Sequence, residues 1–181
     1  MNLKDKFKVS CLSIMSFSGF LALFLMNNKV NLFYLNTPLI YSYGMYFLMP
    51  FLLGTASLAL IKNLPSNDNE IVKGNDIVPV EGNLIPAYMG MFVIALSLNM
   101  EDGILHSVLI MLFLLILWLN IGSVSYFNPF LTILGYRFYA IRTQSNKMIT
   151  VITNKKDFKE CHELNQLRRI NNYTFYWSGN E

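Results

Sequence analysis

Residues 103–137 read GILHSVLIMLFLLILWLNIGSVSYFNPFLTILGYR, and this stretch carries the main structural signal of the chain. It contains no Asp, Glu or Lys, and its only Arg is the last residue. A helix needs about 20 apolar residues to cross the hydrocarbon core of a bilayer, so this stretch exceeds one crossing. We therefore predict a transmembrane helix at residues 104–124, followed by a separate element before Arg137.

The composition of the whole chain also indicates a membrane protein. Of its 181 residues, 54% are hydrophobic and 14% are charged, whereas soluble domains carry about 25% charged residues. Three further uncharged stretches predict transmembrane helices at residues 10–26, 38–61 and 84–100. The first follows a basic segment, as the apolar part of a signal peptide would, but it lacks the small residues of a cleavage site. We interpret it as a signal anchor.

The positions of Lys and Arg predict the orientation. Thirteen of the 14 basic residues lie before the first helix, in the 62–83 loop or after residue 136, and only Lys29 lies at the other end of the helices. Cytoplasmic loops are enriched in Lys and Arg, so both termini are predicted to be cytoplasmic. The predicted architecture is a four-helix transmembrane domain at residues 1–136 and a small α+β cytoplasmic tail at residues 137–181.

The loop at residues 62–83 is rich in Asn, Gly, Pro and acidic residues and has no aromatic residues. This composition is typical of a flexible surface linker, which is the interpretation we favour. A segment that holds a partner is the alternative.

The junction between the two predicted parts contains local start and stop signals. Asn128 followed by Pro129 is typical of a helix start, and Gly135 is typical of a helix stop. We predict a short interfacial helix at residues 129–134, with its apolar side chains at the level of the lipid headgroups. The alternative is that the fourth helix continues to Leu134 with a proline kink. The apolar side chains concerned are Phe130, Leu131, Ile133 and Leu134.

The sequence of the predicted tail indicates a small structure that combines strands and a helix. YRFYAIRT (136–143) and MITVIT (148–153) predict a β-hairpin, KKDFKECHELNQLRR (155–169) a helix, and NYTFYW (172–177) one more strand. Such a tail buries too little apolar surface to be stable alone. We expect it to pack on the membrane surface, on a second copy or on a soluble partner.

Catalytic and metal-binding patterns are missing from the sequence. It has no nucleotide-binding loop, no HExxH and no nucleophile elbow, so we expect no enzyme activity and no cofactor. Cys11 and Cys161 lie in different compartments under the predicted topology, as do His106 and His162, so neither a disulfide nor a metal site is expected. The predicted helices carry no charged residue in their interiors, which disfavours an ion-coupled transporter.

Small and polar residues mark where the helices are expected to pack. Ser18 and Ala22 form a small-xxx-small pair on the first helix, and Gly54 permits a close approach on the second. Asn120 is expected either to bond across helices or to be solvated at the interface.

The basic residues of the tail are candidates for contact with a soluble partner. An alternative is that they only follow the charge rule for topology and attract anionic lipid. The candidates are Arg137, Arg142, Lys155, Lys156, Lys159, Arg168 and Arg169.

This plan, together with the run YFNPFLTILGYRFYAI at residues 126–141, resembles the KwaA family, the membrane subunits of the bacterial Kiwa anti-phage defence system. The resemblance implies a homo-oligomeric, tetrameric sensor in the inner membrane. It also implies docking of a soluble DNA-binding partner, KwaB, on the cytoplasmic side, without direct binding of nucleic acid by this chain.

Three functional hypotheses follow. The first is a non-enzymatic membrane sensor or scaffold whose cytoplasmic part binds a soluble effector. The second is a pore-forming effector that depolarises the cell. The third is a lipid-facing assembly factor without a signalling role.

Overall fold

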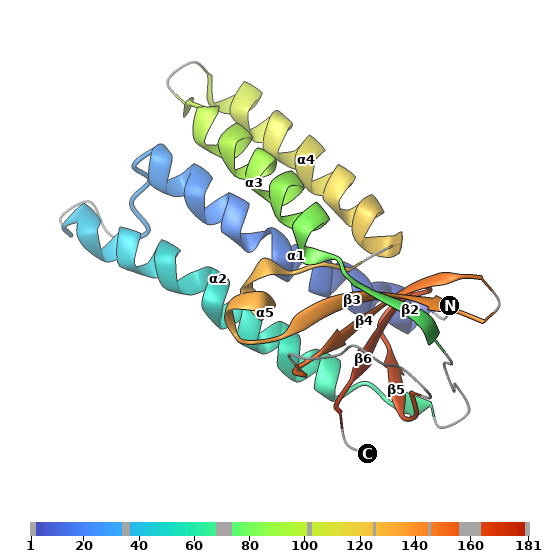
Figure 1. Ribbon diagram of the computed structural model, residues 1–181. Coiled ribbons are helices and arrows are strands. Elements are labelled where there is room, and N and C mark those ends of the chain that lie inside the picture. Colours follow the sequence, from blue (N-terminus) through green and yellow to red (C-terminus); the bar gives the residue numbers. More distant parts are fainter. Residues whose placement is uncertain are drawn as a thin grey trace.

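A bundle of helices carries a β-sheet at one end (Figure 1). The computed structural model places both termini near that end, which also holds the loop between the second and third helices. The structure describes residues 3–33, 37–67, 74–100, 103–124, 126–144, 146–155 and 164–179.

Helix α1 is the central element of the bundle, because it packs against α2, α3 and α4. The four long helices lie in the four predicted regions, with shifted ends. The largest shift is at α1, which begins at Leu3 where the sequence predicted residue 10. The helices are α1 (Leu3–Asn27), α2 (Leu39–Lys62), α3 (Glu81–Ser97), α4 (Ile104–Val124) and α5 (Pro129–Ile133).

Two stretches of the described chain are long and apolar enough to cross a membrane. They are Phe7–Asn27, within α1, and Leu39–Lys62, which is α2. The described apolar parts of α3 and α4 are shorter, at Leu84–Ser97 and Ile104–Asn120. By length and hydropathy, the structure thus identifies two candidate spans where the sequence predicted four.

Within the described residues, the sheet has six strands in the order β1-β5-β6-β4-β3-β2. All neighbouring strands are antiparallel except β4 and β6, which are parallel. The predicted hairpin is confirmed as β3 and β4, and the predicted last strand as β6. The bounds are β1 (Ser66–Asn67), β2 (Gly74–Pro79), β3 (Arg137–Thr143), β4 (Met148–Thr153), β5 (Leu167–Arg169) and β6 (Thr174–Trp177).

Both outer strands of the sheet come from the loop between α2 and α3. β1 pairs with β5 at one edge, and β2 pairs with β3 at the other. The interpretation of the whole 62–83 loop as a flexible linker is therefore wrong for these strands. The sheet also takes strands from both sides of the domain boundary predicted at residue 136. Composition could not reveal this, because the backbone partners of these strands lie far away in the sequence.

The prediction of a helix at residues 155–169 is wrong for the last part of that segment. Leu167–Arg169 is a strand, and Gln166 before it has a φ of 57°, which lies in the left-handed region and does not continue a helix. Pairing with β1 on one side and β6 on the other overrides the weak helical pattern of these residues. Residues 156–163 lie outside the described part of the chain.

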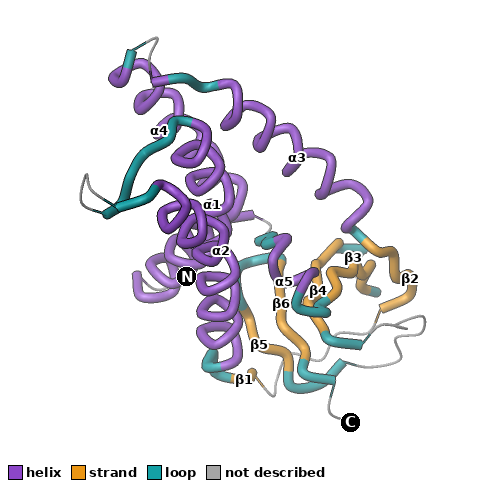
Figure 2. The backbone as a smooth tube through the Cα atoms, turned by 90° about the vertical axis from the view of Figure 1, so that its left-hand side faces the viewer, coloured by secondary structure: helices purple, strands orange, loops and turns teal. Residues whose placement is uncertain are grey.

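The two faces of the sheet are both apolar. Phe138, Ile152 and Tyr176 point toward the bundle and join one continuous core with the helices. Figure 2 shows the sheet below the start of α3 and beside the last turns of α2. The tail therefore packs on helices and loop strands of its own chain, so the expectation that it needs an external surface is wrong. The opposite face holds a second cluster, formed by Tyr139, Ile141, Ile149, Val151, Leu164, Leu167, Phe175 and Trp177.

Candidate functional site at the helix-sheet junction

The short helix α5 begins and ends where the local signals indicate. Asn128 has an extended backbone, and its Oδ1 accepts a hydrogen bond of 3.0 Å from the backbone N–H of Phe130. Pro129 is the first helical residue, where its missing N–H costs no hydrogen bond. Gly135 has a φ of 90°, which suits glycine and turns the chain into β3. The alternative of one helix that continues from α4 to Leu134 does not describe this structure.

The side chain of Asn128 connects the junction to the helix bundle. Its buried amide donates to Ser57 Oγ on α2 and to the hydroxyl of Tyr126, each at 3.3 Å. The backbone N–H of Tyr126 donates in turn to Thr174 Oγ1 on β6 at 3.1 Å. A chain of polar contacts therefore runs from α2 through the junction into the sheet. Complete burial raises the pKa of Tyr126 to about 12, so its hydroxyl stays protonated at neutral pH.

Phe130 inserts its ring between α1 and α2. A methyl group placed on Gly19 of α1 would lie 2.8 Å from Phe130 Cζ, and one placed on Gly54 of α2 would lie 3.0 Å from Phe130 Cβ. Both distances are shorter than a carbon–carbon contact allows, at about 3.5–4.0 Å. A side chain at Gly19 would require the Phe130 ring to shift, and one at Gly54 would require Phe130 to give way by a few tenths of an ångström.

The prediction that α5 lays its apolar side chains at the headgroup level is wrong for two of the four. Phe130 is buried in the bundle, and Leu131 is 0% exposed. Ile133 is 65% exposed and Leu134 is also exposed, so these two point away from the protein. Both sides of this short helix are therefore apolar, and one of them packs on the chain itself.

A series of aromatic rings leads from the bundle to the sheet. Phe20 of α1 packs on Tyr88 of α3, with ring centroids 4.3 Å apart. Tyr88 packs on Phe127 of the junction at 6.1 Å, and Phe127 packs on Phe138 of β3 at 4.9 Å. Trp118 of α4 joins the same group, 5.5 Å from Phe20. The junction thus contacts α1, α2, α3, β3 and β6 within a few residues.

Polar contacts inside the bundle fix α1 against α3 and α4. Trp118 Nε1 donates to Ser16 Oγ at 2.7 Å, and the hydroxyl of Tyr88 donates to the backbone oxygen of Ser16. At the end away from the sheet, the amides of Asn27 and Asn28 donate to the backbone oxygen of Leu98, at 3.2 Å and 3.0 Å. The bundle is thus held by buried polar bonds around Ser16 and by part-buried bonds at the end away from the sheet.

The sequence did not indicate the partners of the junction. Asn128, Pro129 and Gly135 have local signals, but Ser57, Tyr126 and Phe130 acquire their roles only through contacts with distant residues. The one usable signal is the presence of Gly19 and Gly54 among the small residues of the first two helices.

The residues predicted to mediate helix packing lie in different environments. Ser18 and Ala22 are both buried on α1, and Ser18 Oγ donates to the backbone oxygen of Met15 at 2.6 Å. Gly54 packs against Phe130. The exposed amide of Asn120 donates to the backbone oxygen of Ile116 in its own helix, at 2.8 Å.

The basic residues of the tail do not form one patch. Arg137 and Arg142 lie on β3, while Arg168 and Arg169 lie on β5, with β6 and β4 between those strands. Successive residues of a strand point to opposite faces, so each pair is divided between the two faces of the sheet. Lys156 and Lys159 lie outside the described residues.

Individual contacts also distinguish these basic residues. Arg137 lies 3.8 Å from Glu81 Oε1, and the ammonium of Lys155 lies 4.6 Å from the ring centroid of Trp177. Arg169 donates to the backbone oxygen of Asn171 at 3.2 Å. Arg142 is exposed.

Within the described ranges, no three His, Cys, Asp or Glu side chains gather as a metal site would require. His106 is exposed at the start of α4, and Cys11 is a half-buried free thiol. Cys161 and His162 lie outside those ranges.

Comparison with known protein families identifies a match over most of the chain. The family model described as "Anti-phage protein KwaA" matches residues 9–176, which is most of the chain and includes the whole junction. No curated protein and no solved structure matches the chain.

Proposed function

Since the chain belongs to the KwaA family of anti-phage proteins, we propose that it acts in bacterial anti-phage defence as a non-enzymatic sensor and scaffold in the inner membrane. In this proposal, all four long helices cross the membrane and the sheet lies in the cytoplasm. The sheet docks a soluble effector, and several copies, a tetramer in the simplest case, assemble in the bilayer.

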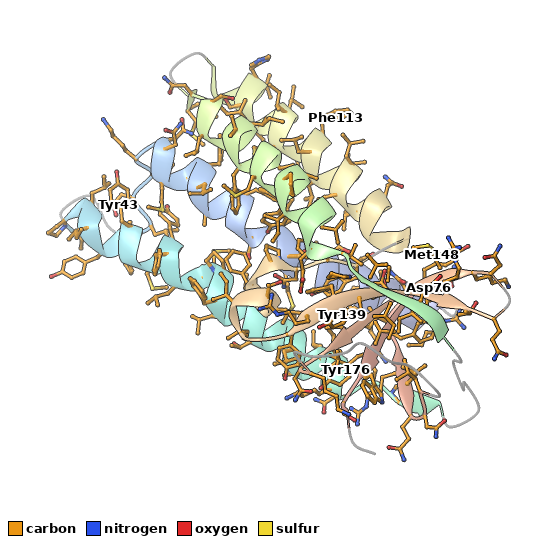
Figure 3. The ribbon with its side chains drawn as sticks, viewed as in Figure 1. Tyr43, Asp76, Phe113, Tyr139, Met148 and Tyr176 are labelled. Atoms are coloured by element: carbon orange, nitrogen blue, oxygen red, sulfur yellow. The ribbon has the colours of Figure 1, made fainter. Side chains whose placement is uncertain are left out.

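Apolar side chains on the outside of the bundle support four membrane crossings. Phe113 of α4, which is 59% exposed, points away from the bundle (Figure 3). In water, these side chains would form far larger exposed apolar patches than soluble monomers carry. A bilayer would solvate them. The others on α3 and α4 are Ile85, Met89, Val93, Ile94, Leu96, Ile104, Leu105, Val108, Leu109, Leu112, Ile116 and Leu117.

The distribution of charge supports a cytoplasmic sheet. The α2–α3 loop and the C-terminal segment meet in one sheet, so they lie at the same end of the bundle. With the start of α1, that end holds ten of the eleven Lys and Arg residues that the structure describes. The positive-inside rule assigns that end to the cytoplasm.

The junction supports a sensing role, and this observation carries the proposal. Phe130 fills the space between Gly19 and Gly54, while Asn128 bonds both Ser57 and Tyr126. A change in the separation or tilt of α1 and α2 would displace this ring. Because packed interiors switch between discrete arrangements, such a displacement would be passed to β3 and β6.

Membrane topology is the first part of the proposal to test. The native thiols are replaced by Cys11→Ser and Cys161→Ser, and a single cysteine is placed by Lys147→Cys or Leu32→Cys. A membrane-impermeant maleimide should label Leu32→Cys in spheroplasts with an intact inner membrane, and Lys147→Cys only after lysis. The reverse pattern, or labelling of both, would contradict the cytoplasmic sheet.

Effector docking needs a separate experiment. The tagged chain is extracted from its native host in mild detergent, and bound proteins are identified by mass spectrometry. We expect a stoichiometric soluble partner, resembling KwaB and able to bind DNA. Arg142→Glu, at an exposed position of β3, should lower its recovery roughly ten-fold by charge repulsion. Lys29→Glu, at the opposite end of the bundle, is the matched control. Recovery of the chain without a partner would count against the scaffold role.

The pore hypothesis has less support from this fold. Aromatic side chains of α1, α3 and α4 fill the described interior of the bundle, around Phe20, Tyr88 and Trp118. Conduction would therefore require a path between copies.

A further inference from the structure

Two basic and two phenolic side chains converge where α2 ends against the sheet. α2 ends at Lys62, and four residues later the chain enters β1, where Ser66 pairs with Arg168 of β5. Arg168 is in turn the cross-strand neighbour of Tyr176 on β6. Figure 3 shows Tyr176 on the side of the sheet near the end of α2.

The phenolic side chains link the two cations. The ammonium of Lys62 lies 5.7 Å from the ring centroid of Tyr136 and interacts with its hydroxyl. The rings of Tyr136 and Tyr176 lie 6.3 Å apart, and both side chains are buried. Burial raises the pKa of Tyr176, so its hydroxyl is protonated and able to donate a hydrogen bond.

No carboxylate of the described residues pairs with Lys62 or Arg168. Among the described residues, an ion pair joins Arg137 to Glu81. It lies at β3, which β6 and β4 separate from β5. Two cations that share one face with buried phenols, and that pair with none of the described carboxylates, form a site for an anion. Phosphate suits it, because ammonium, guanidinium and phenol groups all donate to phosphate oxygens.

The position of the site relative to the membrane identifies the source of the phosphate. Lys62 directly follows the apolar run of α2, whose exposed Leu60 faces the proposed lipid. In the topology proposed above, on which this inference rests, Lys62 lies at the level of the cytoplasmic headgroups. We propose that Lys62, Arg168, Tyr136 and Tyr176 bind the phosphate of an anionic phospholipid of the inner leaflet. The bound lipid bridges the end of α2 and strands β5 and β6, and so holds the sheet against the membrane.

The experiment compares lipid retention by the full chain. Wild-type protein and variants are purified in mild detergent, incubated with phosphatidylglycerol or with phosphatidylcholine, and examined by native mass spectrometry. Lys62→Gln with Arg168→Gln should retain roughly 25-fold less phosphatidylglycerol, at about five-fold for each charge removed near a membrane surface. Retention of phosphatidylcholine should be the same in all variants.

Two further variants separate a local site from net charge and from folding. Arg142→Gln with Lys147→Gln removes two charges near the β3–β4 turn, which points away from the helices (Figure 1), and should retain phosphatidylglycerol like the wild type. Lys62→Arg with Arg168→Lys keeps both charges and should also bind. Equal loss in both Gln pairs, or no loss in either, would overturn the inference.

A competition experiment distinguishes the lipid from free phosphate. Inorganic phosphate should not displace bound phosphatidylglycerol, because the lipid is also held by its acyl chains; displacement would overturn the assignment to lipid. Failure of the membrane topology would appear separately, as a failure of the cysteine-labelling pattern. If the labelling pattern is as proposed but lipid retention does not depend on Lys62 and Arg168, the lipid site is overturned while the topology stands.

Discussion

The ring of Phe130 occupies the space that a side chain at Gly19 would need, since a methyl group there would lie 2.8 Å from Cζ. Gly19 is on α1 and Phe130 is on α5, more than one hundred residues later in the sequence. This pair therefore connects the central helix of the bundle to the segment that enters the sheet.

The first prediction concerns this pair. Gly19→Ala should lower the free energy of unfolding by about 1–2 kcal/mol, because overpacking costs about 1–3 kcal/mol and the better helix propensity of Ala returns up to about 1. Phe130→Leu removes the clashing Cζ atom. In a double-mutant cycle followed by thermal unfolding in detergent, the two changes should couple favourably by about 1 kcal/mol.

Gly90→Ala is the control for this cycle. Gly90 lies on α3, and a methyl group there would meet no atom within 4 Å. This change should stabilise the protein slightly through helix propensity, by at most about 1 kcal/mol. Additive effects of Gly19→Ala and Phe130→Leu would show that the ring does not occupy this space.

The second prediction concerns the cap of α5. Asn128→Ala should lower the free energy of unfolding by about 2–3 kcal/mol, because it removes a helix cap worth about 1 kcal/mol and the buried amide contacts with Ser57 and Tyr126. Pro129→Ala leaves those contacts in place and should cost less than 1 kcal/mol, by roughly the conformational restriction of one proline. Chemical denaturation of the purified protein measures both. Equal costs would contradict the role of the amide.

The third prediction concerns the buried bond between α1 and α4. Trp118→Phe keeps an aromatic ring but removes the Nε1 donor to Ser16 Oγ. It should lower the free energy of unfolding by about 1–2 kcal/mol, the usual cost of losing one buried hydrogen bond. With Ser16→Ala already present, the same change should cost distinctly less. An unchanged cost would mean that the bond does not contribute to stability.

The fourth prediction concerns stability at high pH. The pKa of Tyr126 is about 12 in the folded protein because of burial, and about 10 in the unfolded chain. The folded state therefore holds this proton more tightly, and the associated stability is complete below pH 10 and is lost as pH rises toward 12. The slope approaches about 1.4 kcal/mol per pH unit in that window.

Tyr126→Phe tests this assignment. The variant should be less stable at pH 8, because it lacks the hydroxyl that accepts from Asn128. Its free energy of unfolding should fall less steeply above pH 10 than that of the wild type. Unfolding titrations at a series of pH values give both slopes, and identical slopes would assign the alkaline loss to other groups.

The fifth prediction concerns the start of α3. Glu81 is 13% exposed, and its carboxylate lies 3.8 Å from Arg137, accepting a hydrogen bond from the backbone N–H of Phe138 as well. The Arg137 side chain is 44% exposed, so solvent screens the ion pair and Arg137→Gln should cost at most about 1 kcal/mol. Glu81→Ala also leaves a backbone donor of β3 without its acceptor and should cost more. The reverse order in thermal unfolding would contradict this explanation.

Local signals predicted much of the fold. The uncharged runs place four helices, Asn128 and Pro129 start α5, and alternating β-branched and aromatic residues give the hairpin of β3 and β4. These features depend on side chains and backbone groups within a few residues of one another. Sequence patterns report such interactions directly.

The partners of the candidate site could not be predicted in the same way. The cap of α5 has a local signal, but its amide bonds to Ser57, which is 71 residues earlier in the sequence. Phe130 reads as a membrane-facing residue, and only the approach of Gly19 and Gly54 turns it inward. The basic residues of the tail looked like one group, yet strand alternation divides them between two faces.

The sequence by itself determined which segments are apolar helices, at which end of them the positive charge gathers, and where the chain turns from α4 into β3. The tertiary structure alone decided that the α2–α3 loop supplies both edge strands, that Leu167–Arg169 is a strand, and that the Phe130 ring lies between two helices. The physical reason is the distance along the sequence over which each kind of interaction acts. Helix caps, turns and hydropathy act within one or two turns of chain, whereas strand pairing and close packing depend on backbone and side-chain groups that only the folded chain brings together.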